Sequence, residues 1–110
     1  MASVFKNAIS AGVGTSTTSV YTVPAGTTAT IIGLTVANTT TNSVTTDVQI
    51  TDSSTSTTVY IVKSATVPVG GSLVPIGGEQ KIVLEAGDSL DITSSASSSL
   101  DVTTSILEQS

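Results

Sequence analysis

Acidic side chains are the residues of this chain whose type and spacing could do chemistry. The candidates for a catalytic pair all fall in its last third: Glu79, Glu85, Asp88, Asp91 and Asp101. Two carboxylates on either side of a glycosidic bond can hydrolyse it. Such sites also stack sugar rings on aromatic side chains, and this chain has one Phe, two Tyr and no Trp. The sequence therefore favours solvated acids at strand ends rather than a glycosidase site.

A calcium loop is the second chemistry that these acids could support. Asp88 and Asp91 are three residues apart, and the carbonyls of Ala86 and Gly87 come just before them. Calcium takes about six to eight oxygen ligands, but this spacing matches no established calcium-loop pattern. An Asp after a Gly commonly accepts hydrogen bonds from its own turn. We therefore expect Asp88 to be a turn residue, and we predict no metal and no cofactor.

Nucleophilic catalysis lacks its usual residues. The chain contains no His and no Cys, which excludes Ser–His–Asp and Cys–His arrangements and the common zinc sites. Lys63 and Ser64 are adjacent, but neighbours along a strand point to opposite faces of a sheet. The Gly70-Gly71 and Gly77-Gly78 pairs lack the lysine and following helix of a phosphate loop. We expect that the chain is not an enzyme.

Net charge limits the partners. The chain carries three Lys, no Arg and a formal charge of −5, so the phosphate contacts of a nucleic-acid-binding protein cannot be built. The same deficit argues against binding to an anionic membrane surface. We expect no nucleic-acid partner and no membrane partner.

Hydroxyl-bearing and β-branched residues dominate the composition. The 110 residues include 21 Thr and 18 Ser, and only 10% are charged. Thr and Val favour strands, and Gly or Pro recurs at intervals typical of a β-sandwich. We predict an all-β fold, a single-domain antiparallel β-sandwich over residues 1–110, jelly-roll-like, with about eight strands. Periodicity does not specify strand order, so an immunoglobulin-like order stays open.

Two segments show the alternation most clearly. Thr27–Asn38 has apolar residues on both faces and is expected to be a central strand. Strict alternation places on one of its faces Thr30, Ile32, Leu34 and Val36. Ser43–Thr51 is expected to be half-exposed, with one face made by Val44, Thr46, Val48 and Ile50. The last strand, Leu100–Leu107, should likewise turn inward Leu100, Val102, Thr104 and Ile106.

A short pattern is repeated along the chain. Residues 23–26 (Val-Pro-Ala-Gly) and 84–87 (Leu-Glu-Ala-Gly) both precede an alternating segment, and residues 67–70 (Val-Pro-Val-Gly) are a looser copy. The repeats indicate similar β-turns, or equivalent corners of one jelly roll. Asn38-Thr39-Thr40 matches a glycosylation sequon, which we interpret as a chance match.

Residues 21–38 (YTVPAGTTATIIGLTVAN) and 81–90 (KIVLEAGDSL) carry a family resemblance. Their order, within a Ser/Thr-rich chain, resembles virion proteins of tailed bacteriophages, over about residues 17–108. The resemblance implies a small β-sandwich subunit of a phage capsid or tail, made in the host cytoplasm and located in the virion. It implies no catalytic residues.

Assembly follows from this resemblance and from the composition. Surfaces rich in Ser, Thr and Val lose their water at lower cost than charged surfaces, which favours a homo-oligomer, with a trimer as one option. The segment Ala2–Ile9, within residues 1–12, is either an N-terminal arm that pairs with a neighbouring subunit or an ordinary first strand. The candidate interface residues are Val4, Phe5, Ile9, Tyr21 and Tyr60.

The expected function is a non-enzymatic capsid decoration (cement) protein that binds the major capsid protein and copies of itself. The first alternative is a tail, neck or fibre component of the same particle. The second is a carbohydrate-binding adhesion module, which needs an aromatic-lined concave site that three aromatic residues supply poorly.

Overall fold

The computed structural model describes residues 2–77 and 80–110, which form strands and no helix. None of these residues belongs to a helix that is long and apolar enough to cross a membrane. The nine strands are β1 (Ser3–Val13), β2 (Thr18–Thr22), β3 (Thr28–Asn38), β4 (Val44–Asp52), β5 (Thr57–Val67), β6 (Ser72–Ile76), β7 (Ile82–Leu84), β8 (Ser89–Ser94) and β9 (Leu100–Gln109).

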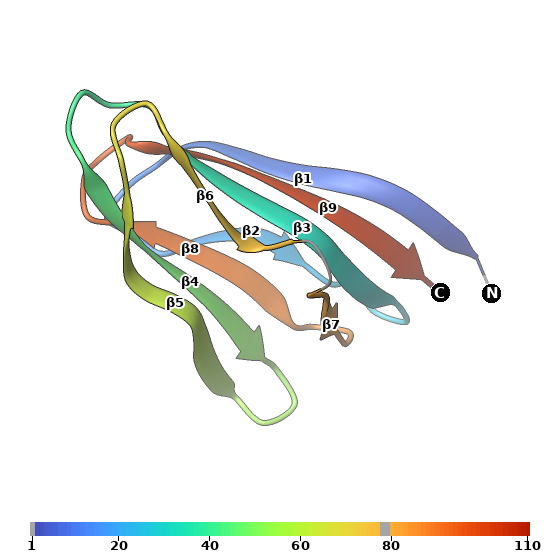
Figure 1. The fold of residues 1–110 in the computed structure, drawn as a ribbon. Coiled ribbons are helices and arrows are strands. Elements are labelled where there is room, and N and C mark those ends of the chain that lie inside the picture. The colour runs from blue at the N-terminus through green and yellow to red at the C-terminus, as the bar shows by residue number, and fades with distance from the viewer. Residues whose placement is uncertain (1, 78–79) are drawn as a thin grey trace.

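The strands make two antiparallel sheets that pack face to face (Figure 1). Sheet A has the order β1-β9-β3-β6, with β7 also paired to β3, and sheet B has the order β2-β8-β4-β5. Strands β6 and β7 pair with different parts of β3, so they occupy one position of the sheet. If β6 and β7 are counted as one position, the chain has eight positions, and β8 and β9 become the seventh and eighth. The first position then pairs with the eighth, the second with the seventh, the third with the sixth and the fourth with the fifth. That pairing is the jelly-roll order, which confirms the predicted fold.

The core lies between the sheets and consists of aliphatic side chains and Tyr21. The alternation predicted for Ser43–Thr51 and Leu100–Leu107 is confirmed, because every residue expected to point inward on β4 and β9 is buried. On β3 strict alternation is wrong. A bulge between Ile31 and Gly33 shifts the pairing with β9, so the inward residues are Ala29, Ile31, Leu34 and Val36 rather than a set containing Thr30 and Ile32. A bulge adds one residue to a strand and reverses the faces beyond it.

Three crossovers between the sheets use the same turn. In the repeated pattern, the backbone N–H groups of Thr27, Gly71 and Asp88 donate to the carbonyl three residues earlier. The glycine in each turn, Gly26, Gly70 or Gly87, has a positive φ, as position i+2 of a type II turn requires. The apolar residue before each turn is fully buried. The repeats are therefore both similar turns and equivalent corners of the jelly roll.

The N-terminal segment is the first strand of sheet A. β1 pairs with β9 from Ser3↔Gln109 to Ser10↔Val102, with an irregularity before Val13. Ala2 and Ser110 exchange both backbone hydrogen bonds, so the N-terminal and C-terminal strands end side by side (Figure 1). Within the chain, the described part of this segment is therefore placed as a first strand of the domain. It extends four residues beyond the predicted end at Ile9.

Candidate functional site

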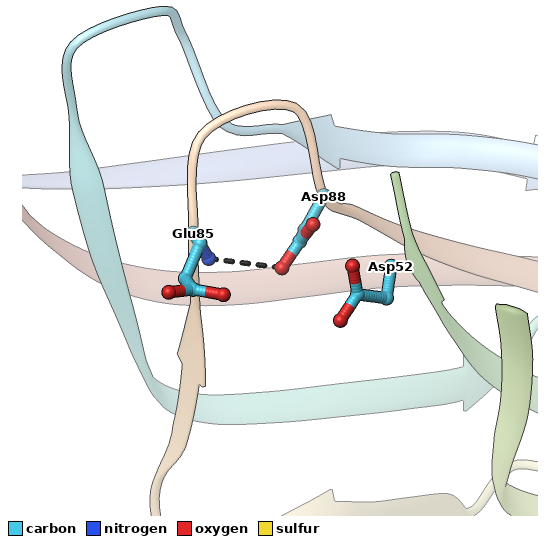
Figure 2. A group of neighbouring side chains, drawn as sticks. All are labelled: Asp52, Glu85 and Asp88. Atoms are coloured by element: carbon cyan, nitrogen blue, oxygen red, sulfur yellow. Dashed lines mark hydrogen bonds between the residues drawn. The ribbon is translucent and has the colours of Figure 1, made fainter. Parts of the chain in front are cut away.

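Three carboxylates meet at one end of the sandwich. Ligand oxygens of Asp52, Glu85 and Asp88 all lie within 4.8 Å of one another. Figure 2 shows Glu85 and Asp88 on the corner between β7 and β8, with Asp52 approaching from the end of β4. The sequence signal pointed at Asp88 and Asp91 instead, and Asp52 was not recognised because it is separated by 33 residues or more from the other two members of the cluster.

Hydrogen bonds within the loops explain why Asp88 is here. Asp88 is only 6% exposed, and its carboxylate accepts the N–H of Glu85 at 2.9 Å and the N–H of Ser53 at 3.1 Å. It therefore closes its own turn and ties that turn to the β4–β5 loop, as expected for a turn residue. Hydrogen bonds from Ser54 lower the pKa of Asp52, so this carboxylate is ionised at neutral pH. The cluster offers oxygen ligands of the kind that a hard cation takes. The hydrogen bonds named above, however, are also those that hold the two loops in place, so they are explained without a cation.

Asp91 lies elsewhere, in the middle of the outer face of sheet B. It is buried, and it accepts hydroxyl hydrogen bonds from Ser19 at 2.6 Å, Thr51 at 2.9 Å and Ser89 at 3.2 Å. These donors come from β2, β4 and β8, so Asp91 links three strands of sheet B. Asp88 and Asp91, which were considered as ligands of one calcium loop, therefore do not lie in the same loop, since alternation turns Asp91 onto the sheet face.

The other described residues considered for catalysis make contacts that stabilise the fold. Asp101 accepts the N–H of Gly12 at 3.0 Å, and Glu79 lies outside the described residues. The Lys63 ammonium sits 4.6 Å from the centre of the Tyr60 ring, while the N–H of Ser64 donates to Asp47.

The side chain of the sequon asparagine, Asn38, is hydrogen-bonded within the fold. Asn38 is buried, its amide donates to the carbonyls of Asn42 and Val67, and its side-chain oxygen accepts from Thr40. These bonds shape the loop between β3 and β4. Asn38 therefore has a structural role in that loop, which is consistent with the interpretation of the sequon as a chance match.

Four of the five candidate interface residues are exposed. Phe5 is 76% exposed and Ile9 70%, and Val4 and Tyr60 are each about half exposed. Tyr21 is the exception and corrects the prediction. It is only 8% exposed, because the apolar face of β2 turns its ring into the core. Tyr21 therefore offers little surface to a partner.

Tyr21 instead joins the two sheets. Its hydroxyl donates to the carboxylate of Glu108 on β9, and Lys6 on β1 lies 3.4 Å from the same carboxylate. Burial, followed by the nearby carboxylate, raises the pKa of Tyr21, and the hydrogen bond from Tyr21 lowers the pKa of Glu108. Sequence reasoning missed Lys6 and Glu108, since nothing in a linear pattern brings residues 6, 21 and 108 together.

A row of apolar and methyl-bearing side chains crosses the outer face of sheet A. Phe5 opposes Leu107, Leu107 opposes Thr30, and Thr30 opposes Val83. Directly opposed residues share a face, so these four residues form one line, here called the Phe5 row. Ile32 in the β3 bulge lines a hollow together with Phe5. Four residues further along β1, Ile9 opposes Thr103, which opposes Thr35. None of these residues is ionisable.

The comparisons with known proteins bear on the fold. No family model matches the chain, and no curated protein matches its sequence. Among solved structures, it is similar to a chain from Bacillus endospore appendages, described as a novel family of disulfide-linked pili. The TM-score is 0.57 at 16% identity, over 98% of this chain and 88% of the other. At that identity the similarity shows a shared β-sandwich fold.

Proposed function

We propose that the chain is a non-enzymatic structural subunit that assembles with copies of itself through sheet A. The observation that carries this proposal is the exposed Phe5 row on the outer face of sheet A, which contains no ionisable side chain, with Phe5 and Ile9 on the edge strand of that sheet. Large exposed apolar side chains gathered on one face mark an interaction surface. Two of the acids considered for catalysis are engaged elsewhere, Asp88 in its turn and Asp91 in the network of sheet B.

The first specific version is a capsid decoration protein in the virion of a tailed phage, bound to the major capsid protein. Its support is the sequence resemblance of residues 21–38 and 81–90, together with a fold that suits a shell subunit. Many copies acting together allow each contact to be weak. A tail, neck or fibre location in the same particle is the alternative, and copy number separates them. Quantitative mass spectrometry of purified particles should give hundreds of copies for the head and at most a few dozen for the tail.

A filament subunit is the second candidate, favoured by the similarity to a chain from disulfide-linked pili. This chain has no Cys, so a filament of it would be held without disulfides. It would then depend on strand pairing and apolar contact alone, and dilution or mild denaturant would dissociate it.

Light scattering of the purified protein at several concentrations tests the shared part of both versions. We expect a mass above that of the monomer which rises with concentration, and electron microscopy of the same sample separates closed oligomers from filaments. A monomer at every concentration would count against self-assembly through sheet A.

A further inference from the structure

The two sheets have four edges, and β1 differs from the other three. β2 is five residues long and bulged, and β5 shifts register twice and contains Ser64 at a positive φ. β6 contains Pro75 and ends before β7 begins. Short length, bulges and proline all protect an edge from pairing with another chain. β1 runs in continuous register from Ser3 to Ser10 with none of these three devices, and its one charged residue, Lys6, is paired with Glu108 of the same chain.

The free edge of β1 presents unpaired backbone groups at defined residues. Ala2 and Ser110 form a hydrogen-bonded pair, and such pairs alternate with non-hydrogen-bonded pairs along antiparallel strands. The even-numbered residues of β1 therefore bond to β9. The odd-numbered residues Ser3, Phe5, Asn7 and Ile9 direct their N–H and C=O groups away from the sheet, ready to accept another strand.

We infer that two copies of the chain pair antiparallel through β1, about a two-fold axis at Asn7. The inference rests on the proposed self-assembly and specifies its surface, since β1 of a second copy is the one edge that matches β1 over its whole length. Each Phe5 then lies opposite the partner's Ile9, and Asn7 lies opposite the partner's Asn7. The two sheets A become one continuous sheet.

Side-chain chemistry selects this register. Phe5 and Ile9 both point to the outer face, so their pairing extends the Phe5 row across the junction and covers two of the most exposed apolar side chains. A register centred on Lys6 would place two ammonium groups opposite each other, which is unfavourable. With the axis at Asn7, Lys6 faces the partner's Ala8 and keeps its ion pair with Glu108.

Cysteine cross-linking tests the register cleanly because the chain has no Cys of its own. In Asn7→Cys the paired Cα atoms would be about 5.5 Å apart, which a disulfide can bridge. Strand pairing holds the two thiols at millimolar effective concentration, so at micromolar protein the disulfide dimer should form about a thousandfold faster than by random collision. Thr66→Cys, exposed on the β5 edge, is the matched control for random collision.

A second pair of variants checks the register independently. Val4 would lie opposite the partner's Ser10, so a mixture of Val4→Cys and Ser10→Cys should cross-link. Each variant alone should not, because its two copies would be about 20 Å apart at about 3.4 Å per residue. Cross-linking of either one alone would overturn the Asn7-centred register.

The outcomes also separate this inference from the proposed function. If Asn7→Cys oxidises no faster than Thr66→Cys while light scattering shows an oligomer, pairing through β1 is wrong and self-assembly stands. If the wild-type chain is also monomeric at every concentration, both fail. Rapid oxidation of Asn7→Cys together with the mixed-pair result would support both.

Discussion

The outer faces of the two sheets differ in how their side chains are hydrogen-bonded and exposed. On sheet B, the carboxylate of Asp91 accepts three hydroxyl hydrogen bonds, and Thr17 pairs with Thr93 as Thr51 does with Thr58. On sheet A, the Phe5 row has no polar group to link except the hydroxyl of Thr30, and its end residues Phe5 and Val83 are largely exposed. A face whose polar groups are satisfied within one chain gains little from a partner, whereas an exposed apolar face gains by losing water.

Loss of the Asp91 carboxylate should have the largest effect. Asp91→Ala leaves three hydroxyl groups without their acceptor on a buried part of sheet B, and we expect a loss of about 3 kcal/mol in the free energy of unfolding. Urea denaturation followed by circular dichroism measures it. Asp91→Asn keeps one acceptor oxygen and should lose less. A cost below about 0.5 kcal/mol would show that the network does not stabilise sheet B.

Substitutions of the glycines at the corners that join the sheets should have the second-largest effect on stability. Gly26 and Gly87 both have a positive φ, but a Cβ at Gly26 meets nothing within 4 Å, while one at Gly87 would lie 2.6 Å from the hydroxyl of Ser53. We expect Gly26→Ala to cost about 1 kcal/mol from backbone strain and Gly87→Ala about 2 kcal/mol. Adding Ser53→Gly to Gly87→Ala should bring the two costs together. Equal costs without that second change would contradict the clash.

The bond between the sheets should contribute less. Tyr21→Phe removes the hydroxyl that donates to Glu108 and should cost about 1 kcal/mol. Because the pKa of Glu108 is lowered in the folded chain, its contribution is present above its ordinary pKa and is lost as the pH falls through the folded value. The raised pKa of Tyr21 acts at the other extreme, since its contribution is lost as the pH rises above 10.

A pH series of thermal melts checks both directions. The wild-type chain should lose stability at the acidic and the alkaline ends, and Tyr21→Phe should flatten the curve at both ends. An unchanged pH profile in Tyr21→Phe would mean that other groups cause the dependence.

Changes on sheet A should have the smallest effect on stability and the largest on assembly. Phe5→Ser with Ile9→Ser alters side chains that are already exposed, so the free energy of unfolding should change by less than about 0.5 kcal/mol. The oligomer seen by light scattering should be lost. Tyr60→Ser, on an exposed strand of sheet B, is the control and should leave the oligomer intact. Loss of assembly in the control alone would reverse the assignment of faces.

Much of the fold was predictable because the signals for it are local. Alternation in β4 and β9 identified their buried faces, and the repeated Pro/Glu-X-Gly pattern identified three corners, since a type II turn needs glycine at one position. The bulge in β3 was not predictable from the pattern, because Ile31 and Ile32 are both apolar and either could turn inward. The structure has nine strands where about eight were expected, and β6 and β7 pair with successive parts of β3.

The chain by itself determined its class: a Thr- and Ser-rich, cysteine-free and weakly charged β-sandwich without the residues of a triad, because composition and period are properties of the sequence. Only the tertiary structure decided which residues from distant segments meet. It brought Tyr21, Glu108 and Lys6 together. It also placed Asp52, and not Asp91, beside Asp88, and it put β1 at an edge of sheet A. Strand order sets these meetings, and in an antiparallel sandwich it depends on long-range pairing that no local pattern records.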